Sequence, residues 1–467
     1  MAANMKTAFP CMAALTLALA GCASLAPPYQ APALPVPAAY PDGGADGAGA
    51  AAQLAWRTYF SDPRMQRLIA QALENNRDLR VAALRVEEAR AAYGIQRAEQ
   101  FPSVGLGVEG SRARVPGDLN PTRKPLLSDQ YQVGLSVGAW ELDFWGRVRS
   151  LKDAALHRLL AGDAARRAVT LALVAQVADA YLALRELDER IGLAERTVAS
   201  RSESLRIFKR RFEVGATSKL DLTQVETLLT QAQTLEAQLR QARELRAHAL
   251  TQLVGAAPDL APQQGFDDAA VLPGLRAGLP SDLLAARPDI AAAEQQLRAA
   301  QANIGAARAA FFPRVTLTTA LGTASAELDG LFDAGSRAWT LAPRLTLPIF
   351  DAGRNQAGLD LATLRRDVAV ANYEQSVQNA FREVADALSG RRWLAEQVRI
   401  QRTALAAQSE RARLAKLRYD NGAAPYLEVL DAQRDLLSVE QQLVQTRRAL
   451  LSSQVSLYAA LGGDASL

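Results

Sequence analysis

Two stretches of this chain repeat each other. Residues 78–106 read DLRVAALRVEEARAAYGIQRAEQFPSVGL and residues 289–317 read DIAAAEQQLRAAQANIGAARAAFFPRVTL, at a constant offset of 211 positions. The matched positions share an acidic residue, a glycine, an arginine and a Phe-Pro pair: Asp78 and Asp289, Gly94 and Gly305, Arg97 and Arg308, Phe101-Pro102 and Phe312-Pro313. Residues 211–255 match residues 418–462 at an offset of 207. This offset differs from the first by only four positions. The pattern indicates an internal duplication, the first constraint on the fold.

Each half contains a very long helical stretch. Residues 147–213 have Leu, Val and Ala at helical spacing and no proline. As one helix they would extend roughly 100 Å at about 1.5 Å per residue. A break at 214–218 offers glycine for a C-cap and hydroxyls for an N-cap, and a second helix returns over 220–254. The second half repeats this order with a helix over 355–420, a break at 421–425 and a return over 426–461. Such lengths predict a coiled coil or helical tube.

A pattern of period two interrupts the helices in both halves. Apolar residues alternate with small or polar ones in four runs, which begin near Val104, Val133, Val315 and Trp339. A soluble antiparallel sheet over helices would show the same alternation. The length of the runs and the aromatic residues near their ends favour transmembrane strands: Trp140, Phe144, Trp145, Trp339 and Phe350. Residues 111–129 and 325–336 are then external loops.

Four strands cannot close a barrel, and an open sheet edge is not tolerated in lipid. Closure must come from symmetric association. Two copies would give eight strands with a filled interior, whereas three copies would give twelve strands around a water-filled lumen. The sequence therefore predicts an α+β membrane protein, a transmembrane β-barrel continued by a long α-helical barrel. Arg344 falls on the small-residue face, as a solvated charge of the lumen.

The N-terminus reads as an export signal. Lys6 precedes an apolar run too short to span a bilayer, and the run ends in Leu19-Ala20-Gly21-Cys22. This sequence resembles the bacterial lipobox, in which the cysteine is acylated and becomes the new N-terminus. We therefore expect a signal peptide over residues 1–21, lipidation at Cys22 and a Pro/Ala/Gly-rich tether over residues 22–60. Whether Met1 or Met5 is the start stays open.

The composition argues against several function classes. Cys11 and Cys22 are the only cysteines, so we expect no disulfide framework. His157 and His248 stand alone on charged helical stretches, which argues against a metal site, and no cofactor is expected. The net charge is +4 with both signs interleaved, which argues against nucleic-acid binding. No catalytic constellation is present, and we expect no enzyme.

The segment between the halves carries a family signature. Residues 279–294 read LPSDLLAARPDIAAAE. This resembles the Leu-Pro-Ser-Asp-Leu-Leu-x-Arg-Arg-Pro-Asp-Ile-x-x-Ala-Glu signature of the outer membrane efflux lipoproteins, the NodT-like branch of the TolC family. Ala286 replaces the first arginine of the usual pair. Residues 425–434, PYLEVLDAQR, and the LYAALGG at 457–463 also resemble this family.

The resemblance implies an assembly. It predicts a homotrimer in the outer membrane, joined by a periplasmic adaptor protein to an inner-membrane transporter of the RND type. The domains would be a first repeat over residues 61–255, an equatorial segment over 256–286 and a second repeat over 287–463. The implied activity is passive export of small toxic compounds, including drugs. Polypeptide export through a TolC-like duct is the alternative, and a trimeric fibre is disfavoured because it needs no barrel.

The family also assigns roles to the helical tips. Leu427, Asp431 and Arg434 match positions that constrict the periplasmic mouth, where three carboxylates around an axis would favour cations. Asp431 and Arg434 could instead form only a local helix pair. In the first repeat Gln224 and Thr227 take the places of Asp431 and Arg434, so a charged ring would come from the second repeat alone.

The turns themselves are expected to dock the adaptor. The residues are those of the two helix breaks: Val214, Gly215, Ala216 and Thr217, with Asn421, Gly422, Ala423 and Ala424. The plain alternative is a helix C-cap, for which glycine is the usual choice. Both interpretations can hold together, because a glycine turn also lets another backbone approach closely.

Overall fold

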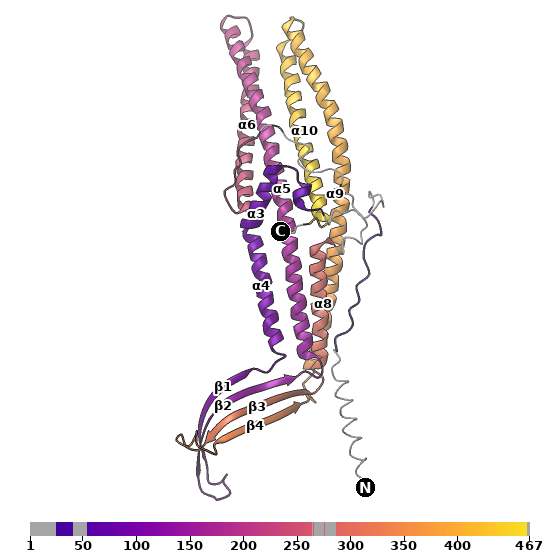
Figure 1. Cartoon of the computed structure of the whole chain (residues 1–467). Helices are drawn as coiled ribbons and strands as arrows, with labels where there is room; N and C mark the ends of the chain where they lie inside the picture. Colours follow the sequence, from indigo (N-terminus) through magenta and orange to yellow (C-terminus); the bar gives the residue numbers. More distant parts are fainter. Residues whose placement is uncertain (1–24, 41–53, 264, 266–274, 276–285, 465–467) are drawn as a thin grey trace. The chain divides into compact units, whose positions relative to one another are not determined.

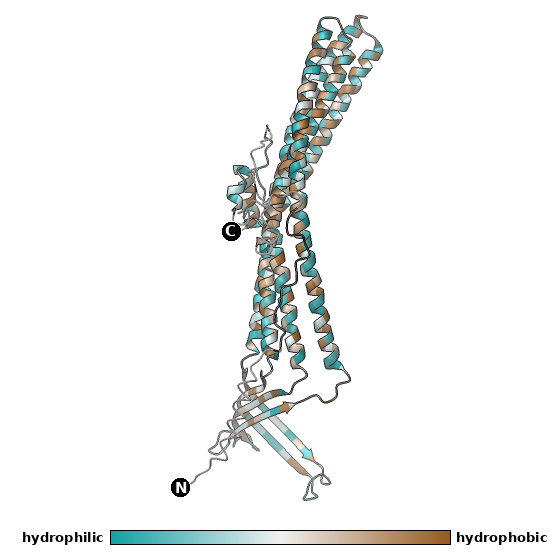
Figure 2. Ribbon diagram, turned by 90° about the vertical axis from the view of Figure 1, so that its right-hand side faces the viewer, coloured by the Kyte–Doolittle hydropathy of each residue, from teal (hydrophilic) through white to brown (hydrophobic). Residues whose placement is uncertain are grey.

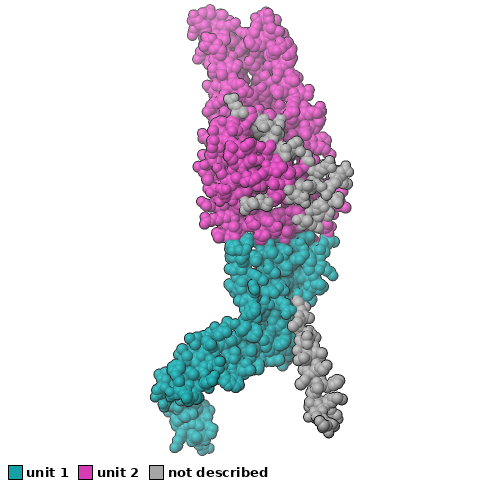
Figure 3. All heavy atoms as spheres, viewed as in Figure 1, with its two compact units in different colours: residues 1–33, 85–162, 292–373 teal, residues 34–84, 163–291, 374–467 magenta. Residues whose placement is uncertain are grey.

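The computed structural model describes residues 25–40, 54–263, 265, 275 and 286–464. The chain forms two compact units, each assembled from three separated stretches of sequence (Figure 3). Unit 1 comprises Met1–Ala33, Arg85–Gly162 and Ala292–Tyr373, and unit 2 comprises Leu34–Leu84, Asp163–Ala291 and Glu374–Leu467. Each unit therefore takes residues from both repeats.

Unit 1 contains a four-stranded antiparallel sheet in the order β1-β2-β3-β4 (Figure 1). The strands are β1 (Val104–Val115), β2 (Leu126–Leu142), β3 (Arg314–Ser325) and β4 (Arg337–Thr346). The first repeat supplies β1 and β2 and the second supplies β3 and β4, so the β2–β3 pairing joins the repeats. The predicted four strands per chain are confirmed.

The pairing register places the apolar residues of all four strands on one face. Leu106 lies opposite Leu135, and Leu135 lies opposite Leu321. Leu321 in turn lies opposite Trp339. Residues paired directly across an antiparallel sheet point to the same face. The predicted alternation is therefore confirmed at these paired positions, and their side chains are exposed, from 51% for Leu135 to 75% for Trp339.

Two strands are longer than the apolar pattern predicts. β1 continues to Val115 and β2 begins at Leu126, so the connection spans only residues 116–125 instead of 111–129. Arg112 pairs with Asp129 beyond the apolar run. Backbone pairing needs no hydrophobic face, which is why side-chain periodicity understates strand length. β4 ends at Thr346, earlier than the alternation through Ile349 suggests, and the prolines at 343 and 348 are suited to an edge strand.

Glycines permit a close backbone contact between the two repeats. Gly134 in β2 lies directly opposite Gly322 in β3. A Cβ on Gly134 would lie 2.7 Å from the Leu321 carbonyl oxygen, and one on Gly322 would lie 2.1 Å from the Val133 carbonyl oxygen. Only glycine allows backbones to approach so closely.

The helices match their predicted bounds to within one residue. α5 (Arg147–Glu213) and α9 (Arg354–Asp420) each span 67 residues. α6 (Lys219–Val254) and α10 (Tyr426–Ala460) are the returning helices. Hydrophobic and hydrophilic residues are interspersed along the whole length of these helices (Figure 2). α5 has an 18-residue stretch apolar enough to cross a bilayer, but half of that stretch is buried inside the protein.

Shorter helices complete the fold. α4 (Arg77–Ala98) and α8 (Pro288–Ala309) are the equivalent helices that precede β1 and β3. In unit 2, α2 (Trp56–Tyr59) and α3 (Pro63–Asn75) pack in the main core. Tyr59 stacks on Tyr458 of α10, with ring centroids 4.6 Å apart.

Parts of the expected tether over residues 22–60 are packed. Tyr40 is buried and stacks on Phe381, with ring centroids 5.0 Å apart. Trp56, Tyr59 and Phe60 are all at most 3% exposed. Burial of these large aromatic side chains is favourable and offsets part of the entropy cost of ordering the segment. The expected signal peptide and Cys22 lie outside the described residues, as does most of residues 256–286.

The ends of the returning helices repeat one contact. Gly255 follows α6 and Gly462 follows α10, both in the left-handed conformation, with φ of 72° and 74°. A Cβ on Gly255 would lie 2.4 Å from the Asn75 carbonyl oxygen, and one on Gly462 would lie 2.6 Å from the Ala286 carbonyl oxygen. The duplication therefore preserved a backbone contact that requires glycine.

Candidate functional site

Both helical tips are tight glycine turns. At the first, Gly215 has φ of 75°, and the Ala216 amide donates to the Arg211 carbonyl at 2.7 Å. At the second, Gly422 has φ of 71°, and the Ala423 amide donates to the Arg418 carbonyl at 2.8 Å. These bonds satisfy carbonyls that the helix ends leave open, so both turns are helix caps. The turn residues nevertheless remain accessible, with the Val214 side chain 64% exposed.

The two tips begin their returning helices differently. Ser218 accepts a bond from the Asp221 amide through its hydroxyl, and the Asp221 carboxylate accepts one from the Ser218 amide, forming a capping box. The Ser218 hydrogen bonds lower the pKa of Asp221. Pro425 occupies the matching place in the second tip and makes no side-chain cap among the described residues.

The predicted gate residues lie on the first turns of α10. Leu427 is 45% exposed. The Arg434 guanidinium lies 3.3 Å from the Asp431 carboxylate, so the local pair expected from their spacing forms within one chain. Both side chains stay partly exposed.

Sequence reasoning missed Asp435, which joins the Asp431–Arg434 pair. Arg434 lies 3.1 Å from the Asp435 carboxylate, and Arg411 of α9 reaches it at 2.7 Å. Hydrogen bonds from Arg411 and Arg434 hold the pKa of Asp435 below its usual range. The sequence does contain a signal for this contact. Positions 411 and 435 are equidistant from the turn at Ala423 and therefore face each other in an antiparallel helix pair.

Tyr426 joins the two tips to each other. Its hydroxyl lies 2.5 Å from the Ser204 hydroxyl of α5. Its ring centroid is 4.7 Å from that of Phe208 and 4.8 Å from that of Tyr419. Arg211 of α5 also donates a hydrogen bond to the Tyr419 hydroxyl. The α5–α6 and α9–α10 pairs are thus linked by an aromatic and polar contact close to the turns.

The family signature performs a structural task. Arg287 is 8% exposed and forms ion pairs at 2.7 Å with Asp289 and with Glu383 of α9. It also donates to the Ala460 carbonyl of α10 at 3.0 Å. Burial by itself lowers the pKa of Arg287, but the hydrogen bonds and charges of both carboxylates raise it overall. The signature arginine therefore ties the start of α8 to α9 and to the end of α10.

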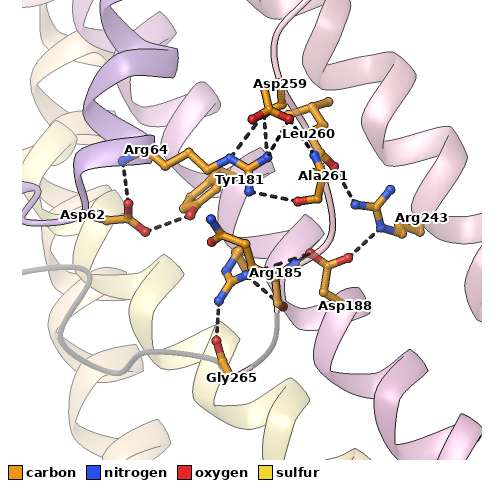
Figure 4. A network of polar contacts seen from close by, with 11 residues as sticks. Asp62, Arg64, Tyr181, Arg185, Asp188, Arg243, Asp259, Leu260, Ala261 and Gly265 are labelled. Carbon is orange, nitrogen blue, oxygen red and sulfur yellow. Dashed lines mark hydrogen bonds and ion pairs between the residues drawn. The ribbon is translucent and has the colours of Figure 1, made fainter.

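A second set of arginines holds the chain that follows α6 (Figure 4). Arg64 donates to the Asp259 and Ala261 carbonyls at 2.6 and 2.9 Å. Arg185 and Arg243 bind further carbonyls of this segment, those of Gln263, Gly265 and Leu260. These side-chain donors satisfy backbone carbonyls that have no helix or sheet partner. They hold the described part of the segment after α6 in place although it has no regular secondary structure.

A polar cluster lies where the strands of unit 1 meet the helices. Glu141 at the end of β2 accepts from Arg147 of α5 at 2.8 Å and from Arg314 of β3 at 2.6 Å. Arg344, predicted on the small-residue face, lies opposite Thr316 in the register and lines the same cavity of about 510 Å³. The cluster fixes the ends of the strands.

Comparison with known proteins explains this combination of sheet and long helices. The family model for "outer membrane efflux protein" matches residues 68–256 and 279–463. The chain belongs to this family. The protein is therefore an outer-membrane efflux channel protein whose helical part extends into the periplasm.

Individual relatives match over almost their whole length. The solvent efflux pump outer membrane protein SrpC of Pseudomonas putida is 45% identical, over 97% of each chain. A crystal structure of a membrane protein from Pseudomonas aeruginosa matches with a TM-score of 0.89 and 41% identity, covering 94% of this chain and 100% of that one. The open-state MtrE outer membrane channel of Neisseria gonorrhoeae matches with a TM-score of 0.86 and 37% identity, over 94% and 98%. The expected fold class is thereby confirmed.

Proposed function

We propose that this efflux protein is the exit duct of a tripartite pump that passively expels small toxic organic compounds. The observation that carries the proposal is the four-stranded sheet with one apolar face, contributed jointly by two repeats that end in helical tips. Its resemblance to a protein named for solvent efflux supports small molecules as the cargo. The duct performs no reaction; the inner-membrane transporter supplies the energy.

The working unit of this proposal is a homotrimer. Within the described residues β1 and β4 each pair on one side only, which leaves two open edges per chain. Joining β4 of one copy to β1 of the next removes every edge, and three copies give a lumen wide enough for water. Purified protein should run as a particle of about 150 kDa before detergent, three times the 50.1 kDa of the chain. A stably folded monomer with protected strands contradicts the trimer.

The helical tips are the proposed sites of gating and docking. In a trimer, Leu427, Asp431 and Arg434 would surround the periplasmic mouth. Asp435 would hold Arg434 in place, and Arg411 would hold Asp435. The accessible turns at residues 214–217 and 421–424 would receive the adaptor. No nucleic acid takes part.

The N-terminus is the proposed lipid anchor. Diacylation of the Cys22 thiol would be followed by hydrolysis of the Gly21–Cys22 peptide bond, which releases residues 1–21, and by acylation of the new N-terminus. More than one acyl chain would then enter the bilayer, and two chains make a firm anchor. Mass spectrometry of the mature N-terminus tests this directly. An unmodified N-terminus at another residue contradicts it.

The function itself is tested in cells that lack their own exit duct. Supplied with its adaptor and transporter, the chain should restore tolerance to organic solvents and hydrophobic antibiotics and lower their accumulation. Polypeptide export is the second candidate within transport. Restored secretion of a polypeptide with no change in drug accumulation would favour that candidate and reject the first.

A further inference from the structure

The cavity where the strands of unit 1 meet the helices has an excess of positive charge. Among the described residues that line it, two are carboxylates, Glu141 and Asp143, and four are arginines. The arginines are Arg147, Arg314, Arg344 and Arg354. All of these residues belong to unit 1, and the cavity has a volume of about 510 Å³. A cleft lined mainly by one sign of charge attracts ligands of the opposite sign.

Both carboxylates of the cavity are engaged. Glu141 accepts from Arg147 through both of its oxygens, each at 2.8 Å, and it also accepts from Arg314 at 2.6 Å. The Asp143 carboxylate accepts from two backbone amides in the first turn of α5, at 3.1 and 2.8 Å. Amides in this position have no partner within the helix. The two acids are thus committed to other groups, and two arginines of the cavity remain.

Arg344 and Arg354 are these remaining arginines. In the described part of the chain, neither side chain forms a hydrogen bond or an ion pair, and both are exposed. Arg344 lies on β4, and Arg354 begins α9. The cavity therefore brings together two unpaired guanidinium groups from different elements. The planar array of donors on a guanidinium matches the oxygens of a carboxylate or a similar oxyanion.

The two repeats differ in how they treat this arginine. Arg147 is the first residue of α5, and Arg354 is the first residue of α9. Arg147 pairs with Glu141, which lies 6 positions before it. The residue 6 positions before Arg354 is Pro348. The second repeat thus has the arginine without the carboxylate that neutralises its equivalent in the first repeat.

A β-bulge in β2 aligns the polar residues of the cavity. The pairing of β2 with β3 slips by one residue just before Trp140. Ala139 lies at this slip with φ of 37°, a positive value that few residues other than glycine adopt. Beyond the slip Glu141 lies opposite Thr316, and Thr316 lies opposite Arg344. Because a one-residue slip exchanges the two faces of a strand, the bulge places Glu141 on the face of Arg344, opposite the apolar face.

The cavity also has a fixed aromatic wall. Trp145 stacks on Phe312 with ring centroids 4.7 Å apart, and its indole N–H donates to the Pro313 carbonyl at 2.8 Å. The Asn355 side chain donates to a carbonyl just after α8 at 3.1 Å, which ties the start of α9 to the same wall. Phe144 and Phe312 are each 39% exposed. Apolar surface is therefore accessible in the cavity that holds the unpaired arginines.

We propose that this cavity binds an amphiphilic organic anion. The carboxylate or sulfonate of the ligand would bind Arg344 and Arg354, and its apolar part would lie against Phe144 and Phe312. Small-molecule sites have volumes of this size and combine apolar walls with a few polar groups. The ligand would reach the cavity from inside the barrel, because Arg344 lies on the strand face opposite the apolar one. The proposal rests on the proposed function as an exit duct, and it names one class of cargo.

Binding is tested with purified protein in nanodiscs of zwitterionic lipid. Calorimetric titration with octanesulfonate should show saturable binding to the wild type, whereas octyltrimethylammonium, with the same tail and the opposite charge, should not bind. Arg344→Gln with Arg354→Gln should weaken octanesulfonate binding by about tenfold or more, because it removes charge-assisted hydrogen bonds. Arg123→Gln with Lys124→Gln is the matched control, since it removes the same charge from the connection between β1 and β2. Equal affinities of both double variants, or no binding to the wild type, overturn the site.

Two further measurements separate ligand binding from effects on folding and on lipid. The glutamine variant of Arg344 and Arg354 should keep the wild-type mass in solution, because neither arginine has a partner in the described fold. A variant that no longer assembles would show that these arginines hold the fold, which overturns the site. The wild-type affinity should also stay the same when anionic phosphatidylglycerol replaces part of the zwitterionic lipid. A many-fold loss of affinity would assign the cavity to a lipid headgroup and reject the free anion.

Cell assays separate this site from the duct proposal. In cells that lack their own exit duct, the glutamine variant should restore full tolerance to neutral solvents and only partial tolerance to the anionic detergent dodecyl sulfate. A wild-type protein that restores solvent tolerance but binds no octanesulfonate leaves the duct standing and rejects the site. A wild-type protein that binds octanesulfonate but restores no tolerance rejects the duct and, with it, the role of the cavity in export.

Discussion

The two helical tips share a backbone and differ in chemistry. Each follows a 67-residue helix and turns through a glycine at positive φ, Gly215 in the first and Gly422 in the second. The first tip then uses the Ser218–Asp221 capping box, whereas the second begins at Pro425 and carries the charged group on α10. The duplication has preserved the glycines that the turns require, and it has changed the side chains around them. Repeat-matched substitutions should therefore have equal effects in the scaffold and unequal effects at the tips.

The largest effects are expected in the strands. Leu106→Arg and Leu317→Arg occupy equivalent positions on the apolar face. If that face meets lipid, each should destabilise the inserted barrel by about 2–4 kcal/mol near the bilayer midplane. Leu345→Arg should do the same, and Thr318→Arg, on the opposite face, should be tolerated better. Folding titrations into bilayers measure the difference, and equal tolerance at Leu317 and Thr318 would show that the face assignment is wrong.

The next largest effect is expected on the free energy of unfolding, at the two glycines that follow the returning helices. Gly255→Ala and Gly462→Ala each force a Cβ against a backbone carbonyl at positive φ. We expect each to lower the free energy of unfolding by about 1–3 kcal/mol, since a strained backbone of this kind costs that much. Denaturant midpoints of the two variants should shift together. A large shift for one and none for the other would break the equivalence of the repeats in the scaffold.

The tips should respond unequally to loss of charge. Asp431→Ala with Arg434→Ala removes the pair at the proposed mouth, so single-channel conductance should rise and cation preference should fall. The matched double, Gln224→Ala with Thr227→Ala, removes no charge and should change both quantities little. Trimer mass should remain unchanged in both, because the strand edges are untouched. Wild-type conductance and selectivity in both variants would place the gate elsewhere.

The smallest effect is expected on the stability of the first tip in acid. The folded-state pKa of Asp221 is lowered by its bonds with Ser218, so its contribution to stability is complete above its unfolded pKa of about 3.9. That contribution is lost as the pH falls through the lower folded pKa. Hydrogen exchange at the start of α6 should therefore increase in acid below about pH 4. Asp221→Asn should remove this pH dependence; an unchanged dependence in that variant would assign it to another group.

Much of the architecture followed from local patterns in the sequence. Helical spacing without proline defined α5, because each residue in a helix contacts neighbours three or four positions away. Alternation defined both faces of the sheet, because strand geometry has a period of two. The duplication identified equivalent positions such as Gly94 and Gly305 without any structure. The signature at residues 279–294 identified the family.

Only the tertiary structure decided which residues complete each contact. Asp435 joins the charged residues of the proposed gate because antiparallel packing brings it to Arg411. Tyr426 reaches Ser204 although more than two hundred positions separate them. Gly94 and Gly305 look alike in the sequence, yet Gly305 packs against Ala26 and Ser150, whereas among the described residues nothing lies within 4 Å of a Cβ built on Gly94. Backbone hydrogen bonding and local periodicity are encoded within a few residues, whereas the partner of a side chain depends on how distant segments pack.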